Sequence, residues 1–205
     1  MPQNFTSAPE NYEIHSFVSE GPDIVVTPAE HKGRGVLHSH SFYEIVYVAE
    51  GFTLHQSCGR ITMLITGDFF FVKPGEVHSY INAYQTKLYN LLFVPAALGD
   101  SFSALSALPG LDEMFSPSGE SLDPTHRLLH VSIGERRNIE SALEKMIGER
   151  ENKNVGWEVS LKARLTSLLI KYARMYDEQY DEHSAGGKKR SDNDYYGYIY
   201  KLLCY

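Results

Sequence analysis

The sequence has 205 residues, 42% of them hydrophobic and 22% charged, and its formal net charge is −7 at pH 7. The length and composition fit one well-buried domain with an appendage, and the negative charge argues against a domain that grips nucleic-acid phosphates by itself. Residues 1–20 carry three glutamates and no apolar run. No stretch of the chain approaches ~18 consecutive apolar residues, and Cys58 and Cys204 lie far apart, so we expect a cytoplasmic protein with reduced thiols and no membrane span.

The N-terminal two thirds of the chain are predicted to be mainly β. Residues 1–11 are polar with two prolines and are predicted to form an N-terminal arm. Residues 12–131 then alternate short β-rich runs with Gly, Pro and Asp turns, a spacing typical of a sandwich or barrel. The predicted runs are 24–27, 44–48, 61–66, 69–72, 77–82, 88–94 and a last one at 127–131, with short helical turns near Leu105 and at 111–115 before the last run.

Residues 132–183 are predicted to form a helical dimerisation region of two helices. Ser132 and Glu135 have the spacing of a capping box, which would begin a helix that ends near Glu151. A second helix is expected over about 157–181, with an apolar stripe. This stripe could pack on the barrel, on the first helix or on a second subunit, and it is wide enough to serve two of them. Its members are Leu161, Leu165, Leu168, Leu169, Tyr172, Met175 and Tyr176.

Residues 184–205 are predicted to be a linker and the start of a further domain. The segment begins charged and ends in the apolar, helix-compatible run 195–205. An apolar run of this kind needs a partner to pack against, and none follows it. We therefore expect it to open a C-terminal domain that is absent from this chain.

The chemistry-bearing residues fall in two short motifs. In an extended strand side chains alternate between faces, so His38, His40, Phe42 and Glu44 are expected to share one face. By the same rule, His78 shares a face with Tyr80 and Asn82, and Asn82 is expected to be a structural hydrogen-bonding residue. If both faces line one interior, His38, His40, Glu44 and His78 converge, and this donor set suits one divalent transition metal such as Zn, Ni, Mn or Fe with open positions. The alternative is that the four groups hydrogen-bond to one another or to a ligand without metal.

These motifs resemble the two motifs of the cupin superfamily, which is a jelly-roll barrel or double-stranded β-helix. The first motif matches at the histidines, the glutamate and Gly51, and the second at Gly67, Gly75, His78 and Asn82. Two positions depart from the pattern. Gly33 and Gly35 bracket the expected first glycine, and Pro74 stands one residue late. The resemblance implies a cupin barrel followed by a C-terminal helical pair.

The order of arm, barrel, helices and linker further resembles the N-terminal half of AraC-type transcription regulators. Three segments carry this likeness, namely 38–51, 67–80 and 161–169. In that family the barrel binds a small effector, often a sugar, the helices form a homodimer, and C-terminal helix-turn-helix units bind DNA. The resemblance therefore implies a ligand-sensing and dimerisation module whose DNA binding belongs to a longer parent chain.

The effector-binding residues are expected to be His38, His40, Phe42, Glu44, His78 and Tyr80, with Phe69 or Phe71 as further wall. Aromatic faces beside polar edges suit a sugar ring or a small aromatic molecule. An alternative function uses the same donors as the metal ligands of a cupin enzyme, such as a dioxygenase or sugar isomerase. We expect no catalysis, because the late helices serve a regulator better than a separate enzyme.

Overall fold

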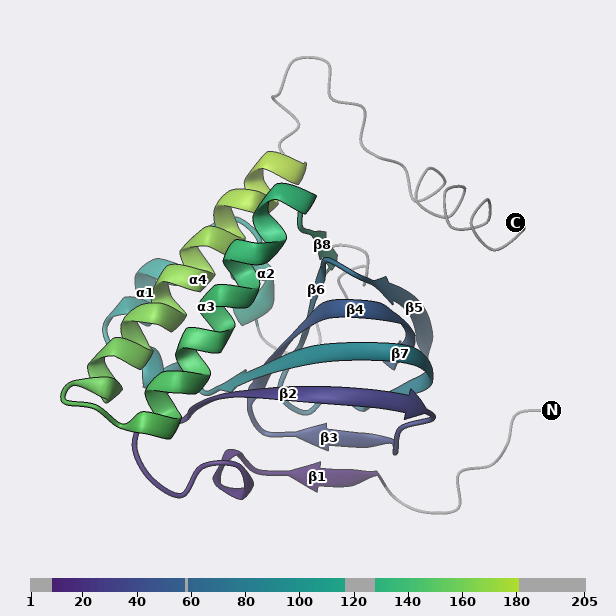
Figure 1. Ribbon diagram of the computed structural model, residues 1–205, viewed down its shortest axis with the longest axis horizontal. Coiled ribbons are helices and arrows are strands. Elements are labelled where there is room, and N and C mark those ends of the chain that lie inside the picture. The colour runs from purple at the N-terminus through teal and green to yellow at the C-terminus, as the bar shows by residue number, and fades with distance from the viewer. Residues whose placement is uncertain (1–8, 58, 117–127, 181–205) are drawn as a thin grey trace.

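The computed structural model describes residues 9–57, 59–116 and 128–180, in which a curled β-sheet is followed by two long helices (Figure 1). The strands are β1 Glu10–Tyr12, β2 Ile24–Gly33, β3 His38–His40, β4 Tyr43–Ser57, β5 Arg60–Ile65, β6 Asp68–Val72, β7 His78–Phe93 and β8 Leu128–His130. The helices are η1 Ile14–Ser16, η2 Pro95–Leu98, α1 Ser101–Leu105, α2 Leu111–Phe115, α3 Ile133–Asn152 and α4 Trp157–Tyr180. The predicted segment 184–205 and residues 1–8 of the predicted arm lie outside the described residues.

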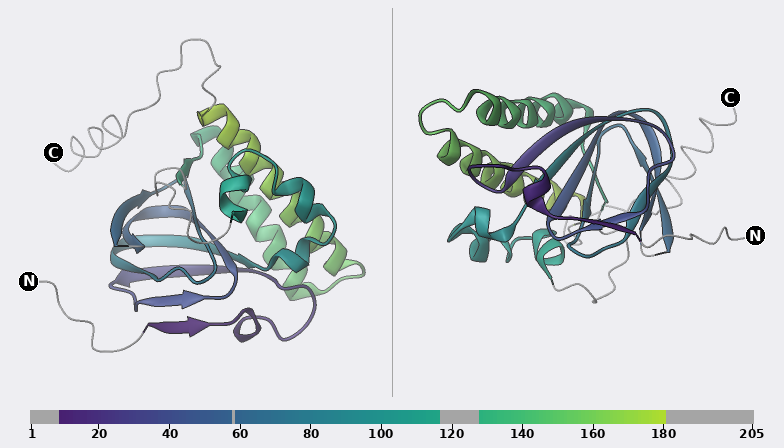
Figure 2. Two further views of the ribbon diagram at one scale, coloured as in Figure 1. Left: turned by 180° about the vertical axis from the view of Figure 1, so that it is seen from behind. Right: turned by 90° about the horizontal axis from the view of Figure 1, so that it is seen from below.

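Two long antiparallel strands, β4 and β7, form the centre of the sheet. The strand order is β1-β3-β7-β4-β6-β8, with β2 added on β7 and β5 on β4. Register shifts between these long strands, and a positive φ of 44° at Gln85, bend the sheet, which Figure 2 shows curling round on itself. The two runs predicted at 77–82 and 88–94 are therefore one strand, because the backbone at Gln85 absorbs the bend without ending the pairing.

The N-terminal segment joins the edge of this sheet. Strand β1 pairs in parallel with β3, with Glu10 opposite His38 and Tyr12 opposite His40 (Figure 1). The sequence predicted Glu10 and Asn11 to lie in the arm, but the structure places both residues in a strand. The few polar residues of this edge gave no alternation from which a strand could be predicted.

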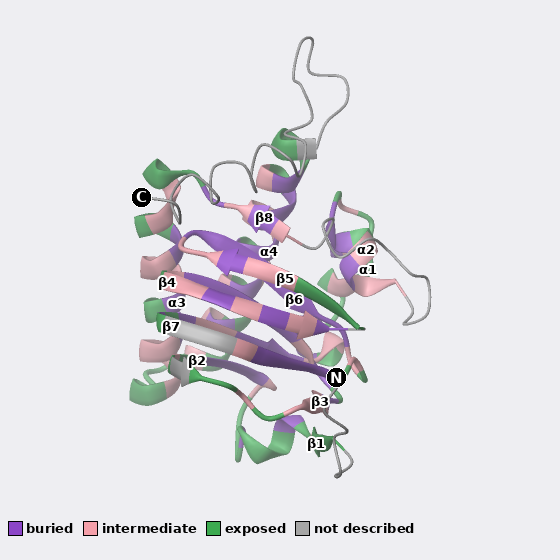
Figure 3. Cartoon of the chain, turned by 90° about the vertical axis from the view of Figure 1, so that its right-hand side faces the viewer, coloured by how far each residue is buried: buried purple, intermediate pink, exposed green. Residues whose placement is uncertain are grey.

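The sheet has two apolar faces, and Figure 3 shows buried residues along its central strands. Its inner face packs side chains such as Val46, Leu64 and Phe70 against one another. Its outer face packs against the helices and includes Phe69 and Phe71. The expectation that Phe69 or Phe71 lines the ligand site is therefore wrong. All five residues of β6 are buried, and after Asp68 the other four are apolar, so no alternation of polar and apolar residues indicates which side of the strand faces inward.

Both predicted helices are present, and they cover the outer face of the sheet (Figure 2). The apolar stripe of α4 forms part of the core of this chain: Leu165 and Leu169 are 0% exposed and Tyr176 is 9% exposed. The stripe is therefore not free to pack on a second subunit. The part of the chain that the structure describes contains no helix long and apolar enough to cross a membrane.

The capping box predicted at the start of α3 does not form. Ser132 is the N-cap residue, but its side chain makes no capping hydrogen bond. The Glu135 backbone N–H donates to the Ser132 carbonyl oxygen at 2.9 Å, and the Glu135 carboxylate instead pairs with Lys171 of α4. An ion pair with the neighbouring helix thus replaces the predicted capping contact.

Candidate functional site

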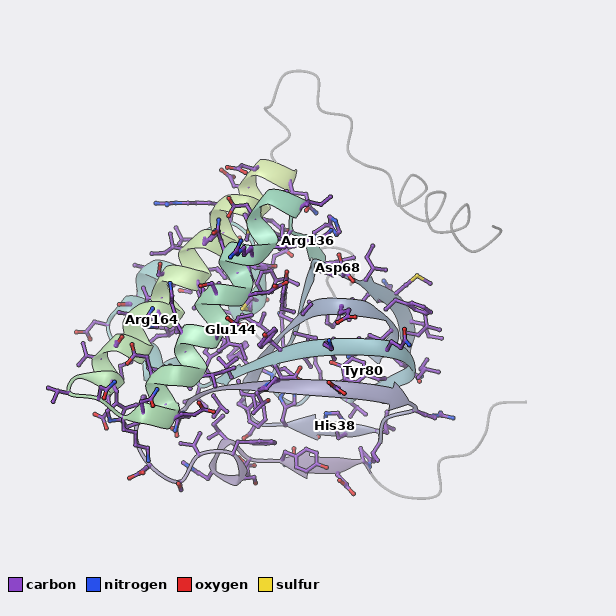
Figure 4. All side chains as sticks on the ribbon, in the orientation of Figure 1. His38, Asp68, Tyr80, Arg136, Glu144 and Arg164 are labelled. Carbon is purple, nitrogen blue, oxygen red and sulfur yellow. The ribbon has the colours of Figure 1, made fainter. Side chains whose placement is uncertain are left out.

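The four predicted donor residues come from three strands of the sheet. His38 and His40 lie on β3, Glu44 on β4 and His78 at the start of β7. A bend at residues 41–42 separates β3 from β4, so the predicted single strand through His38 and Glu44 is in fact two. The convergence holds because His38 is the cross-strand partner of His78. Figure 4 shows His38 and Tyr80 on the sheet, away from the two long helices.

Glu44 is the centre of this cluster. Its Oε2 atom lies 3.1 Å from His40 Nε2 and 3.3 Å from His78 Nε2. The rings of His38 and His78 are in contact, with centroids 4.2 Å apart. One donor atom from each of His38, Glu44 and His78 lies within 4.8 Å of the others, a group that is able to hold a metal ion. His40 joins this group through its contact with Glu44.

Backbone carbonyl groups fix the orientation of all three histidine rings. The Nδ1 atoms of His38, His40 and His78 lie 2.9, 2.7 and 3.2 Å from the carbonyl oxygens of residues 36, 42 and 76, respectively. A carbonyl oxygen only accepts, so each Nδ1 carries a proton and donates it. In the neutral form each Nε2 is then unprotonated, and those of His40 and His78 face an acceptor oxygen. A proton or a metal ion shared between these nitrogens and the Glu44 carboxylate would relieve this facing of acceptor atoms.

Burial strengthens these electrostatic interactions. His40 and His78 are each 1% exposed and Glu44 is 5% exposed, whereas His38 is partly exposed. Burial by itself would raise the pKa of Glu44, but hydrogen bonds from His40 and His78 outweigh it and hold the pKa of this carboxyl below its usual value. Burial, followed by repulsion from His78, lowers the pKa of His38.

The two predicted aromatic residues also border the cluster. The Phe42 ring stacks on His40, with centroids 4.3 Å apart and an interplanar angle of 9°. Phe42 packs with Ile14 and Val18 of the N-terminal segment, so it closes one side of the site. Tyr80 is 4% exposed, and burial followed by the charge of Glu44 raises the pKa of its phenol well above the usual value. The structure thus brings all six predicted effector-binding residues into one neighbourhood, while the side chain of Asn82 lies outside the described part.

Comparison with known proteins assigns the chain to a family. The family model described as the AraC-like ligand binding domain matches residues 21–169, which is most of the chain. The chain belongs to this family. The family match, the two motifs and the curled sheet confirm the predicted cupin barrel followed by a helical pair.

Curated relatives of this AraC-like domain are transcription regulators. The chain is 27% identical over 141 residues to the HTH-type transcriptional activator RhaR of Klebsiella pneumoniae, an alignment that covers 69% of this chain and 48% of that protein. It is 29% identical over 107 residues to RhaR of Escherichia coli O139:H28, covering 52% and 36%. The chain thus spans about half, or less, of the curated relatives it matches.

Solved structures with a partial likeness to the AraC-like domain include cupins. An RmlC-like cupin from Shewanella frigidimarina is 28% identical, with 34% of this chain and 64% of that chain covered at a TM-score of 0.32. KdgF from Halomonas sp. is 22% identical, with 37% and 73% covered at a TM-score of 0.33.

His55 is a residue of this AraC-like domain that the sequence motifs did not reveal. It lies on β4, is 0% exposed, and its ring centroid is 5.3 Å from that of His78 and 5.4 Å from that of Tyr80. In an unbroken strand, residues that face the same side are separated by an even number of positions. Glu44 and His55 are separated by eleven positions, and yet both face inward. The register shifts between residues 48 and 52 exchange the two faces of β4, so counting in twos from Glu44 predicts the wrong side for His55.

A second polar cluster joins the barrel to the helices. Asp68 is fully buried, and its Oδ1 atom accepts a hydrogen bond from His130 Nδ1 of β8 at 2.7 Å. Arg136 of α3 lies with its Nη2 atom 3.2 Å from His130 Nε2, and its Nε–H donates to the Val131 carbonyl at 3.2 Å. Asp68 and Arg136 face this junction in Figure 4. A Cβ at Gly67, whose φ is +96°, would lie 2.6 Å from Arg136 Nε, so glycine is required there.

Proposed function

We propose that this chain is the effector-sensing module of an AraC-type transcription regulator and that its inner histidine cluster binds the effector. The observation that carries the proposal is the buried convergence of His38, His40, Glu44 and His78 within a domain of the AraC-like ligand binding family. A sensor of this kind performs no chemistry on its ligand, so the cluster needs only to bind and release. The relatives named as transcriptional activators support this function over catalysis.

We propose a small polar effector of the sugar class. The site combines Phe42 and Tyr80 rings with imidazole and carboxylate groups. Ring faces pack on the apolar face of a pyranose, while imidazole nitrogens and carboxylate oxygens hydrogen-bond to hydroxyl groups. Glu44 supplies an acceptor for such a hydroxyl, and its buried negative charge disfavours an anionic ligand at the same place.

The donor set also fits one divalent transition metal. His38, Glu44 and His78 would hold the ion, with His40 beside them, and each histidine already donates its Nδ1–H to a backbone carbonyl, as metal-binding histidines commonly do. A bound ion would supply a Lewis-acid centre with positions left for effector oxygens. The same centre is what the alternative function, a metal-dependent cupin enzyme, would need.

Two measurements test these proposals. In the first, the melting temperature of the protein is recorded with a panel of neutral pentoses and hexoses, and the sugars that raise it are titrated by calorimetry. A sugar present at 100 times its Kd stabilises the fold by about 2.7 kcal/mol, which corresponds to a rise of roughly 5–10 °C. His78→Ala should abolish this rise, and Glu50→Gln, a surface substitution on the same strand as Glu44, should keep it. No rise with any sugar contradicts the proposed effector class.

The second measurement is elemental analysis of protein purified without a histidine tag. We expect near-stoichiometric metal in the wild type and none in a variant with both His40→Ala and His78→Ala. No metal in either protein would contradict the metal proposal and remove the basis of the enzyme alternative. Metal together with turnover of a sugar, rather than its reversible binding, would favour the enzyme.

Dimerisation and DNA binding belong to the same proposal. We propose a homodimer through the late helices, and because the stripe of α4 is core, the contact would use the outward face of α4. This face exposes Val159 at 72% and borders a groove of about 1020 Å³ that includes Ala163, Ser167 and Ile170. Light scattering on wild type and Ala163→Glu should give a dimer and a monomer, respectively, and a monomeric wild type would contradict this part. DNA contact would belong to helix-turn-helix units elsewhere in the parent protein.

A further inference from the structure

The inner face of the sheet carries polar atoms that have no hydrogen-bond partner. Both ring nitrogens of His55 are sealed from solvent and make no hydrogen bond within the described part of the chain. The Oδ1 atom of Asn90 is also buried and makes no hydrogen bond within the described residues, and the strand partner of Asn90, Val46, faces the interior. Buried polar groups are nearly always hydrogen-bonded, so an imidazole with two unpartnered nitrogens needs an explanation.

The packing around His55 does not supply the missing partners. Its ring meets the Phe70 ring edge-on, with centroids 4.6 Å apart, and an aromatic face is only a weak acceptor. Thr53 and Ser57, which face inward on either side of His55, are also buried, at 0% and 7% exposure. This half of β4 thus presents three consecutive inward polar side chains, where an apolar core would have aliphatic ones.

The position of His55 connects it to the proposed effector site. The rings of His38, His78 and His55 follow one another with centroid separations of 4.2 and 5.3 Å. His38 is partly exposed, His78 is 1% exposed and His55 is 0% exposed. The three histidines therefore form a polar series that begins at the rim of the site and ends in the interior, and Tyr80 stands beside its inner end.

We propose that His55 is a specificity-determining residue that hydrogen-bonds a hydroxyl group of a neutral, polyhydroxylated effector at the inner end of the site. This inference rests on the proposed sensing function. A neutral imidazole offers one donor and one acceptor, which is the pairing capacity of a sugar hydroxyl. Both ring nitrogens of His55 are sealed from solvent and unpartnered within the described residues, so its donor and its acceptor are both available to such a hydroxyl.

The test compares His55→Leu, which keeps much of the volume without polar atoms, with His55→Gln, which keeps a donor and an acceptor. Each is measured against wild type by thermal melting and calorimetry. The probes are D-glucose and D-galactose and the matching anions D-glucuronate and D-galacturonate, followed by a wider panel of neutral sugars. Leu54→Ala, a substitution of the neighbouring residue that does not face inward with His55, is the matched control.

We expect a neutral sugar to bind the wild type, to bind His55→Leu at least ten times more weakly, and to bind His55→Gln with an intermediate affinity. Equal affinity for wild type and His55→Leu overturns this inference while leaving the sensing function intact. Tighter binding of a uronate than of its neutral sugar overturns the assignment of a neutral ligand. If the wild type binds none of the panel, the sensing function fails as proposed, and this inference fails with it.

A measurement without ligand distinguishes a failure of the His55 inference from a failure of the sensing function. An imidazole without partners destabilises the free protein, so His55→Leu should raise the melting temperature without ligand, by about 2–4 °C for a chain of this size. A melting temperature that is unchanged or lower would show that His55 has a structural partner in the free protein, and the inference would be overturned whatever the sugars do.

Discussion

Replacement of Glu44 by Gln is the substitution that most directly tests the electrostatics of the site. It removes the charge on which two buried imidazoles converge, at 3.1 and 3.3 Å from Oε2, and leaves the size of the side chain unchanged. A hydrogen bond to a charged group contributes about 1.5–3 kcal/mol, and removal of one member of a buried ion pair costs about 3–5 kcal/mol. The Gln amide N–H group can still donate to one unprotonated imidazole Nε2, so we expect the free energy of unfolding to fall by about 2–4 kcal/mol.

The assay is urea denaturation followed by circular dichroism, with EDTA present so that only the protein's own groups contribute. Glu50→Gln is the matched control, because Glu50 lies on the same strand and pairs with Lys87 while 60% of its side chain is exposed. A surface pair of this kind contributes about 0–1 kcal/mol. If the unfolding free energy of Glu44→Gln lies within about 0.5 kcal/mol of that of Glu50→Gln, the cluster does not hold the charge that we infer.

The same variant has a defined pH dependence. The pKa of Glu44 is lower in the folded protein than in the unfolded chain, where a glutamate titrates near ~4.3. The carboxylate therefore stabilises the fold above that pH, and the contribution is lost as the pH falls toward the lower folded pKa, because the unfolded chain then binds more protons. In EDTA, the difference in unfolding free energy between wild type and Glu44→Gln should shrink as the pH falls below ~4.3, and a difference that grows on acidification would refute the assignment.

Two further pairs of variants test the packing. Gly21 and Gly33 share a φ of +77°, but a Cβ would overlap Trp157 only at Gly21. Gly33→Ala should therefore cost ~1–2 kcal/mol by its backbone alone and Gly21→Ala about 1–3 kcal/mol more, and equal costs in chemical denaturation would contradict the contact. Leu165→Ala should cost about 2–5 kcal/mol, because Leu165 is 0% exposed, and Val159→Ala, at a 72% exposed position, about 0.5 kcal/mol or less. A small effect at Leu165 would show that the stripe of α4 is not core.

The sequence predicted the elements well wherever a face had a clear chemical preference. The helices at 133–152 and 157–180, the short helices at 101–105 and 111–115 and the last strand at 128–130 lie where periodicity and turn residues placed them. The four donors converge as their spacing in the two motifs predicted. In these segments local pattern and tertiary structure agree, so the pattern was sufficient.

The failures come from bends and from strands buried on both sides. Side-chain alternation is a reliable guide only while the register is unbroken, and the shifts after Val48 moved His55 to the inner face of β4. In β6 every residue is buried, so alternation could not distinguish Phe70, which faces inward, from Phe69 and Phe71. The stripe of α4 was correctly identified as apolar, but an apolar stripe does not specify its partner, and here the partner is the protein's own core.

We propose that a small neutral effector binds on the inner face of the sheet, between His38 at the rim and His55 in the interior. The most direct measurement is a crystal structure of the protein with the sugar that most raises its melting temperature. We predict density for that sugar in contact with His78 and Glu44, with a hydroxyl within hydrogen-bonding distance of a His55 ring nitrogen. Sugar density on the outer surface, with the inner histidines still paired only with Glu44, would contradict this binding site.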